Sequence, residues 1–172
     1  MALKLFYPLI MLLVCTTQGC ISDDEPQGPS LKAGDSLPHF SVTFDNGVAV
    51  STESLIGKVP VIVFFNTNCA DCRKELPVVQ RLYDTFQDSP KVEVLPISRE
   101  EGQEEILRYW EANNLSMPFS AQENRDVYSL FAPSVIPRIY IADTQGVIKV
   151  CYDDSDMPAL ETLIFVISGL LQ

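Results

Sequence analysis

The most constraining feature of this chain is a seven-residue apolar run that ends just before a pair of cysteines. The run, Val59-Pro-Val-Ile-Val-Phe-Phe65, is rich in β-branched and aromatic residues and shows no alternation with polar residues. Such a run is typical of a strand buried on both faces, within a sheet that helices cover on both sides. Cys69 and Cys72 follow, and the apolar positions from Ala70 to Phe86 recur with helical spacing. A central strand therefore leads directly into a long helix, with the cysteines at the junction.

The other segments continue the alternation of strands and helices. Two short strands flank the strong turn signal Asp45-Asn46-Gly47. The remaining predicted elements are strands over 92–97, 138–142 and 147–152, and helices over 103–113, 126–131 and 158–171. Parallel strands joined by crossover helices, followed by a terminal hairpin, predict a three-layer α/β domain with a central mixed sheet flanked by helices. No internal repeat and no second domain are indicated.

The first twenty residues are typical of an export signal. One cation, Lys4, precedes an apolar run from Leu5 to Val14, which is shorter than the roughly 20 residues that span a bilayer. The run closes on Gly19-Cys20 and resembles a bacterial lipoprotein signal, although Thr17 stands where such signals usually carry Leu. We expect cleavage before Cys20 and lipidation of Cys20, with an ordinary secretory signal as the alternative.

This processing divides the chain into three parts: a signal peptide over 1–19, an acidic tether over 20–32 and one domain over 33–172. The tether begins with Asp23, Asp24 and Glu25 soon after Cys20. It is either a solvated spacer or an export signal similar to those that send lipoproteins to the outer leaflet in some Gram-negative lineages. We therefore expect an extracytoplasmic protein of the cell envelope, anchored by lipid at the outer membrane. The sequence does not distinguish the periplasmic leaflet from the surface leaflet.

Charge and residue content exclude several classes of function. The chain has 23 acidic and 12 basic residues and a formal net charge of −11, so it lacks the basic surface that nucleic acid binding requires. A zinc site would need two ligands besides the cysteine pair, and only Cys151 and His39 are available, so no metal is predicted. A purely structural disulfide between Cys69 and Cys72 would close too short a loop to stabilise the fold.

The placement of Cys69 and Cys72 predicts dithiol chemistry. Cys69 begins the helix, where unpaired amides and the helix dipole favour a thiolate. Cys72 lies one turn further on, close enough to displace a partner from a mixed disulfide. The Cys69–Cys72 pair is then the redox group, and no organic cofactor is needed. Asp71 opposes formation of the neighbouring thiolate, which favours reduction of substrates over their oxidation.

The segment Phe64-Phe-Asn-Thr-Asn-Cys-Ala-Asp-Cys-Arg-Lys-Glu-Leu-Pro77 resembles the active site of the TlpA/ResA group. These are membrane-tethered, extracytoplasmic thiol–disulfide oxidoreductases with a thioredoxin-like fold, and the resemblance covers about residues 33–170. It implies that Cys69 and Cys72 are catalytic and that protein disulfides or dithiols are the substrates. It also implies a membrane protein as electron donor.

The resemblance assigns two residues outside the cysteine motif. Pro137 stands where this fold carries a cis-proline facing the disulfide, so Ile136 is expected to pair with a substrate chain. An ordinary trans-proline at a strand start is the alternative. Glu101 aligns with an acidic residue that assists proton transfer near the dithiol. The alternative is that Glu101 belongs to a solvated, acidic helix start.

Three departures from the family pattern bear on the site. Asn68 replaces the usual Trp before the first cysteine, and Ala70-Asp71 replaces a dipeptide that often contains proline. These three residues are the ones expected to contact substrate beside Cys69. Val63 occupies a position where many thioredoxins have a buried Asp, so proton transfer must use water or another group such as Glu101.

Two other functions remain open. The altered motif is compatible with a non-catalytic binding or assembly module of the cell envelope. Thiol peroxidases have the same fold with a PxxxTxxC motif, but Ile62 and Asn66 occupy its Pro and Thr positions here. Cys151, in the terminal hairpin, is predicted to be a buried core thiol, with an auxiliary redox role as the alternative.

Overall fold

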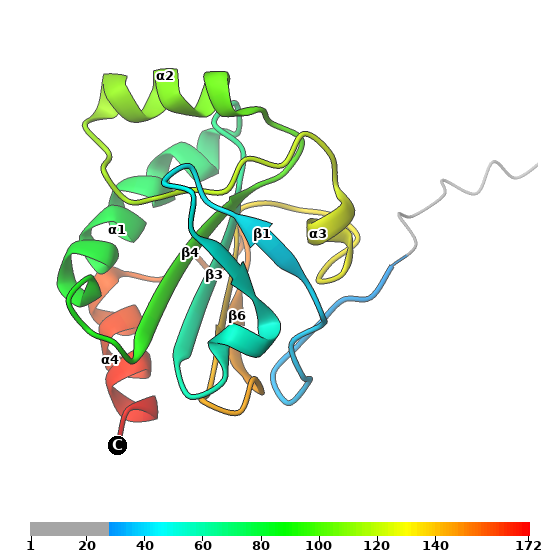
Figure 1. Cartoon of the computed structure of the whole chain (residues 1–172), viewed down its shortest axis with the longest axis vertical. Coiled ribbons are helices and arrows are strands. Elements are labelled where there is room, and N and C mark those ends of the chain that lie inside the picture. The colour runs from blue at the N-terminus through cyan, green and yellow to red at the C-terminus, as the bar shows by residue number, and fades with distance from the viewer. Residues whose placement is uncertain (1–27) are drawn as a thin grey trace, which may run out of the picture.

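The computed structural model describes residues 28–172 (Figure 1). The predicted signal peptide, the lipidation site Cys20 and most of the tether lie outside the described residues. The described part folds around a four-stranded sheet of order β4-β3-β5-β6, with a separate two-stranded sheet, β1-β2. Among residues 28–172, no helix combines the length and the apolar character needed to cross a bilayer.

The central sheet is mixed, as predicted. Strand β3 (Val59–Phe65) pairs in parallel with β4 (Val92–Ser98) on one side and antiparallel with β5 (Arg138–Ala142) on the other. Strand β6 (Ile148–Tyr152) completes the terminal hairpin with β5. Because β3 occupies an interior position and both of its faces are covered, all seven of its residues are buried.

Each face of β3 supports its own apolar cluster. Val61, Val63 and Phe65 face helices α1 (Ala70–Phe86), α2 (Gln103–Asn113) and α4 (Leu160–Leu170). Ile62 and Phe64 face the opposite side, where the covering elements are the hairpin of β1 (Ser41–Thr43) and β2 (Ala49–Ser51) and the short helix α3 (Asp126–Ser129). Figure 1 shows these elements on opposite sides of the sheet, which gives the three layers expected from the sequence.

Differences from the predicted elements lie at their ends. A 3₁₀ turn, η1 (Thr52–Leu55), was not predicted, and helix α3 ends at Ser129 rather than at residue 131. The residue before a proline is disfavoured in helical conformation, and Ala132 precedes Pro133, so the helix gives way to turns. Helix α4 begins at Leu160, after Ala159 in extended conformation. These shifts leave the β3–α1 junction as predicted.

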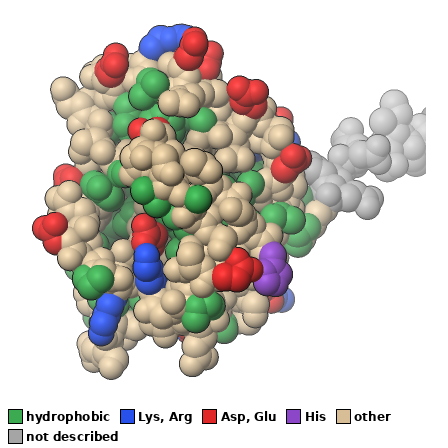
Figure 2. Space-filling model, viewed as in Figure 1, with side chains coloured by type: hydrophobic (Ala, Val, Ile, Leu, Met, Phe, Trp, Pro, Cys, Tyr) green, Lys and Arg blue, Asp and Glu red, His purple; other side chains and the backbone are tan. Residues whose placement is uncertain are grey.

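One face of the domain shows how its acidic side chains are distributed. On the face in Figure 2, acidic side chains are spread over several elements rather than gathered in one patch. The net charge of −11 favours solubility, because molecules that carry a large charge of one sign repel one another.

We expect Phe64→Ala to destabilise the domain by about 3–5 kcal/mol, the usual cost of truncating a buried aromatic side chain. Phe64 is fully buried, and its ring contacts the rings of Tyr128, Phe131 and Tyr140. Urea unfolding measures the change. Phe165→Ala is the matched control, because Phe165 is 80% exposed on α4, and its effect should stay within about 0.5 kcal/mol. Equal losses in the two variants would contradict the assigned core.

Candidate active site

Cys69 caps the N-terminus of helix α1. Its backbone is extended, and its sulfur accepts a hydrogen bond from the amide of Cys72, with 3.4 Å between Sγ and N. An N-cap side chain satisfies one of the amides that a helix start leaves unpaired. The sulfur is therefore positioned to carry negative charge, and Cys69 remains partly exposed to a reaction partner.

Cys72 lies behind Cys69 in the apolar cluster under α1, and its side chain is fully buried. Burial raises the pKa of the Cys72 thiol, and the hydrogen bond with Cys69 raises it further. Cys69 and Cys72 are both free thiols, so the structure represents the dithiol form. An accessible first sulfur and a protected second sulfur are the arrangement that the helix spacing predicts.

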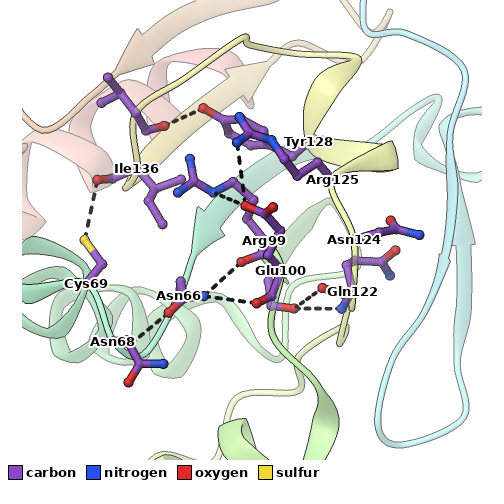
Figure 3. Close-up of polar contacts among 12 residues, drawn as sticks. Asn66, Asn68, Cys69, Arg99, Glu100, Gln122, Asn124, Arg125, Tyr128 and Ile136 are labelled. Atoms are coloured by element: carbon purple, nitrogen blue, oxygen red, sulfur yellow. Dashed lines mark hydrogen bonds and ion pairs between the residues drawn. The ribbon is translucent and has the colours of Figure 1, made fainter. Parts of the chain in front are cut away.

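Hydrogen bonds with the segment after β4 hold the loop between β3 and α1 in place. The Asn66 side chain donates to the carbonyl of Arg99 at 3.0 Å, and the Arg99 amide donates to the carbonyl of Phe65 at 2.8 Å. Figure 3 shows Asn66 pointing toward Arg99 and Glu100 and accepting from the Asn68 amide. The residues that lead into Cys69 are therefore held by hydrogen bonds along their length.

Glu101 is part of this support. Its carboxylate accepts from both the backbone amide and the hydroxyl of Thr67, and its side chain is buried. The predicted residue thus lies at the active-site loop and not on a solvated helix start. Both of its oxygens are bound by Thr67, which lies two residues before Cys69. Glu101 therefore acts on the dithiol indirectly, through Thr67.

The segment 133–137, which we call the cis-proline loop, lies against Cys69. The Ile136–Pro137 peptide bond is cis, as the resemblance implied. The Cys69 thiol donates to the carbonyl of Ile136, with 3.5 Å between Sγ and O, and Figure 3 shows the two residues facing each other. Sequence-distant residues are thereby brought together at one sulfur.

The residues predicted to contact substrate surround the same sulfur. Asn68 and Ala70 are exposed, and Asp71 is partly exposed. The Asp71 carboxylate accepts from Lys74 at 2.8 Å and raises the pKa of that lysine. This ion pair counteracts the repulsion that Asp71 was expected to exert on a thiolate at Cys69. Asn68 opens onto a hollow of about 300 Å³ whose charged lining residues are Glu100, Glu101, Glu105 and Glu123.

Glu75 is a feature of the site that our sequence reasoning missed. It lies one turn after Cys72 on α1, only 4% exposed, and its Oε1 atom has no hydrogen-bond partner among the described residues. Burial raises the pKa of Glu75 to about 7. The signal was present in the helical periodicity, since Glu75 falls on the same buried face as Cys72 and Val79.

Cys151 lies away from this arrangement. It is on β6, opposite Tyr140 on β5, and it packs against the second apolar cluster. The side chain packs against the core, as predicted, but it is only partly buried, because β6 is an edge strand of the sheet. Among residues 28–172, no three Cys, His, Asp or Glu side chains are grouped to hold a metal ion.

A thioredoxin-like sheet, a dithiol at the start of the following helix and a cis-proline beside it define a class of protein, the thioredoxin-fold thiol–disulfide oxidoreductases. Residues 33–151 match the AhpC/TSA family. The chain belongs to this family, and the prediction of a ResA-like thiol–disulfide oxidoreductase is confirmed.

Individual relatives agree with this assignment. The thiol-disulfide oxidoreductase ResA of Bacillus cereus is 24% identical over 148 residues, which covers 83% of each chain. Among solved structures, a putative protein disulfide isomerase from Bacteroides thetaiotaomicron is 25% identical with a TM-score of 0.75, over 83% of this chain and 94% of the other. StoA from Bacillus subtilis, at 20% identity, shares the fold with a TM-score of 0.63, over 78% and 96% of the two chains.

Glu75 should make stability fall as pH rises. Its pKa in the folded protein is about 7, above the ordinary value of 4.5, so the folded protein holds a proton that the unfolded chain releases. Between about pH 4.5 and 7 the free energy of unfolding should decrease with pH, by on the order of 3 kcal/mol in total. In Glu75→Gln, which stays neutral, this contribution to the slope should vanish.

Urea unfolding of the reduced protein at a series of pH values measures this difference. Glu105→Gln is the matched control, since Glu105 is an exposed acid in the first turn of α2 and should leave the slope close to that of the wild type. An unchanged slope in Glu75→Gln would contradict a proton held at this position.

Proposed function

We propose that this protein reduces protein disulfides by dithiol exchange through Cys69 and Cys72. The observation that carries the proposal is the pairing of a partly exposed Cys69 sulfur at the start of α1 with a buried Cys72 thiol one turn behind it. The cis-proline loop lies beside the same sulfur and offers a backbone against which a substrate chain can pair. A protein that only binds partners has no need of this combination.

The exchange proceeds in two displacements. The Cys69 thiolate attacks one sulfur of the substrate disulfide, a mixed disulfide forms, and the other substrate sulfur leaves as a thiolate that takes up a proton. The Cys72 thiolate then attacks Cys69 Sγ, which releases the second substrate sulfur. The substrate gains two electrons, and Cys69–Cys72 becomes a disulfide that a membrane electron donor must reduce again.

Two acidic residues have different parts in this cycle. Glu75 lies one turn after Cys72 on the buried face of α1, and no hydrogen bond joins the two; with a pKa of about 7 it can take up, through an intervening water, the proton that Cys72 loses on becoming a nucleophile. Glu101 contributes by fixing Thr67 and hence the approach to Cys69. Substrate contacts are made by Asn68, Ala70 and Asp71 on one side of Cys69 and by Ile136 on the other.

The proposal includes an anchored location. The sequence before the described domain supports cleavage before Cys20, lipidation of Cys20 and attachment to the outer membrane of the cell envelope. The acidic residues after Cys20 would then form a tether between the lipid and the domain. In this location the protein meets exported proteins, which are the ones that carry disulfides.

Cysteine variants test the chemistry. In a thiol-dependent insulin reduction assay, Cys69→Ser and Cys72→Ser should each lower turnover by about 100-fold or more, because both displacements are required. Cys72→Ser should still form mixed disulfides through Cys69, and in intact cells these adducts would identify the substrates. Cys151→Ser is the matched control and should retain full activity, since Cys151 lies on β6 away from the site.

The rival functions give other outcomes. A binding module would leave insulin oxidised with the wild type as with the variants, and Cys72→Ser would trap no adducts. A peroxidase would consume hydrogen peroxide with Cys69 alone and be insensitive to Cys72→Ser. Either result would contradict the reductase proposal.

A Cys20 variant tests the anchor. In Cys20→Ser the predicted lipid acceptor is lost, so the protein should fail to take up radiolabelled palmitate and should move from the membrane to the soluble fraction of lysed cells. Cys151→Ser again serves as control. Retention of label or of membrane association in Cys20→Ser would contradict lipidation at this position.

A further inference from the structure

The cis-proline loop is held by side chains from outside it. Four consecutive backbone carbonyls each accept a hydrogen bond from a different side chain. The pairs are Arg125 Nη2 with Pro133 at 2.7 Å, Arg138 Nε with Ser134 at 3.1 Å, Tyr128 Oη with Val135 at 2.5 Å and Cys69 Sγ with Ile136 at 3.5 Å. The loop forms no strand or helix of its own, so these bonds take the place of a regular ladder.

The third of these hydrogen bonds, from Tyr128, is made to a residue whose backbone conformation is unfavourable. Val135 has a φ of +74°, a left-handed conformation that a β-branched residue rarely adopts. Such a conformation persists where the surroundings over-determine it. Tyr128 donates to the carbonyl of this same residue, so its hydroxyl is placed where the loop most needs support.

The ring of Tyr128 is held in place by contacts with three side chains. Two guanidinium groups lie over its ring, Arg99 at 5.1 Å and Arg125 at 5.5 Å from the ring centroid. The Glu100 carboxylate lies 3.7 Å from Arg99 and 3.6 Å from Arg125, and so links them. The Phe64 ring contacts Tyr128 edge-on from the core. Figure 3 shows Arg99, Glu100, Arg125 and Tyr128 grouped near Ile136 and Cys69.

While the carbonyls of the loop are engaged, its amides are not. The backbone N–H groups of Ser134, Val135 and Ile136 donate to no acceptor within residues 28–172. An extended chain that enters beside Cys69 can accept from such amides, and strand-like pairing of this kind depends on the direction in which the backbone points. Fixing the carbonyls fixes that direction.

We propose that Tyr128, whose ring contacts Arg99 and Arg125, is a positioning residue that holds the cis-proline loop in the conformation required for pairing with protein substrates. The proposal rests on the proposed disulfide exchange. Tyr128 touches neither sulfur nor substrate, and it acts through the carbonyl of Val135. Its removal should therefore affect substrates that need backbone pairing and spare those that need only Cys69.

Tyr128→Phe tests this, because it removes the hydroxyl and keeps the ring in contact with the arginines. For reduction of insulin, KM should rise about three- to tenfold, the range expected for one buried hydrogen bond between neutral groups, with kcat little changed. The rate with hydroxyethyl disulfide, which is too small to pair with the loop, should stay within about twofold of the wild-type rate. Tyr83→Phe, on the far part of α1, is the matched control and should change neither.

A second measurement reports on the loop without turnover. Backbone ¹⁵N order parameters of Val135 and Ile136 should fall in Tyr128→Phe and remain at the wild-type values in Tyr83→Phe, because the loop loses one of its four supports. Unchanged order parameters, or equal losses on insulin and hydroxyethyl disulfide, would overturn the proposal. A wild type that reduces neither disulfide would instead refute the proposed function, and the order parameters would still decide whether Tyr128 holds the loop.

Discussion

The burial of β3 on both faces is the constraint on which the site depends. Because every residue of this strand is covered, the chain can reach solvent only at the strand's end, where Asn66 begins a short loop. The following helix must turn back at once to cover the sheet, so its N-terminus lies at the same edge. Cys69 is therefore placed where a buried strand delivers the chain to the surface and where helix amides are unpaired. The chemistry of the sulfur follows from the topology.

The parts of the site are assembled from segments that are remote in sequence, and each is held by its neighbours. Glu101, after β4, fixes Thr67, while Arg73 on α1 donates to the carbonyl of Thr67 from the other side. Tyr128 fixes the cis-proline loop. Since the two segments that are supported, the loop between β3 and α1 and the cis-proline loop, form no strand or helix, side-chain hydrogen bonds supply the rigidity that a strand ladder would otherwise give. A thiol must meet its substrate in a defined direction, and this support makes that possible.

The sequence predicted those features whose signals are local. The apolar run of β3, the helical spacing of α1 and the Cys69–Cys72 pair each lie within one segment, and their bounds agree with the structure. The support of the site could not be predicted in this way. That Glu101 binds Thr67, and that Arg99 and Arg125 contact the Tyr128 ring, depends on how separate segments pack. Glu75 is an intermediate case: its position on the buried helix face could be predicted from the sequence, but only the packed structure shows that its Oε1 atom has no partner among residues 28–172.

The same packing explains why arginine is the cation beside the cis-proline loop. There a cation must bind a carbonyl oxygen and also contact an aromatic ring, as Arg125 does with Pro133 and Tyr128. A planar guanidinium can do both at once, whereas the ammonium group of lysine is a compact point charge. Arg99, the other arginine in contact with the Tyr128 ring, has an electrostatic effect on Cys72. Burial and the bond with Cys69 raise the pKa of Cys72, and the positive charge of Arg99 opposes that rise. In the proposed exchange, Arg99 would therefore contribute both to the support of the cis-proline loop, through Tyr128, and to ionisation of the buried thiol.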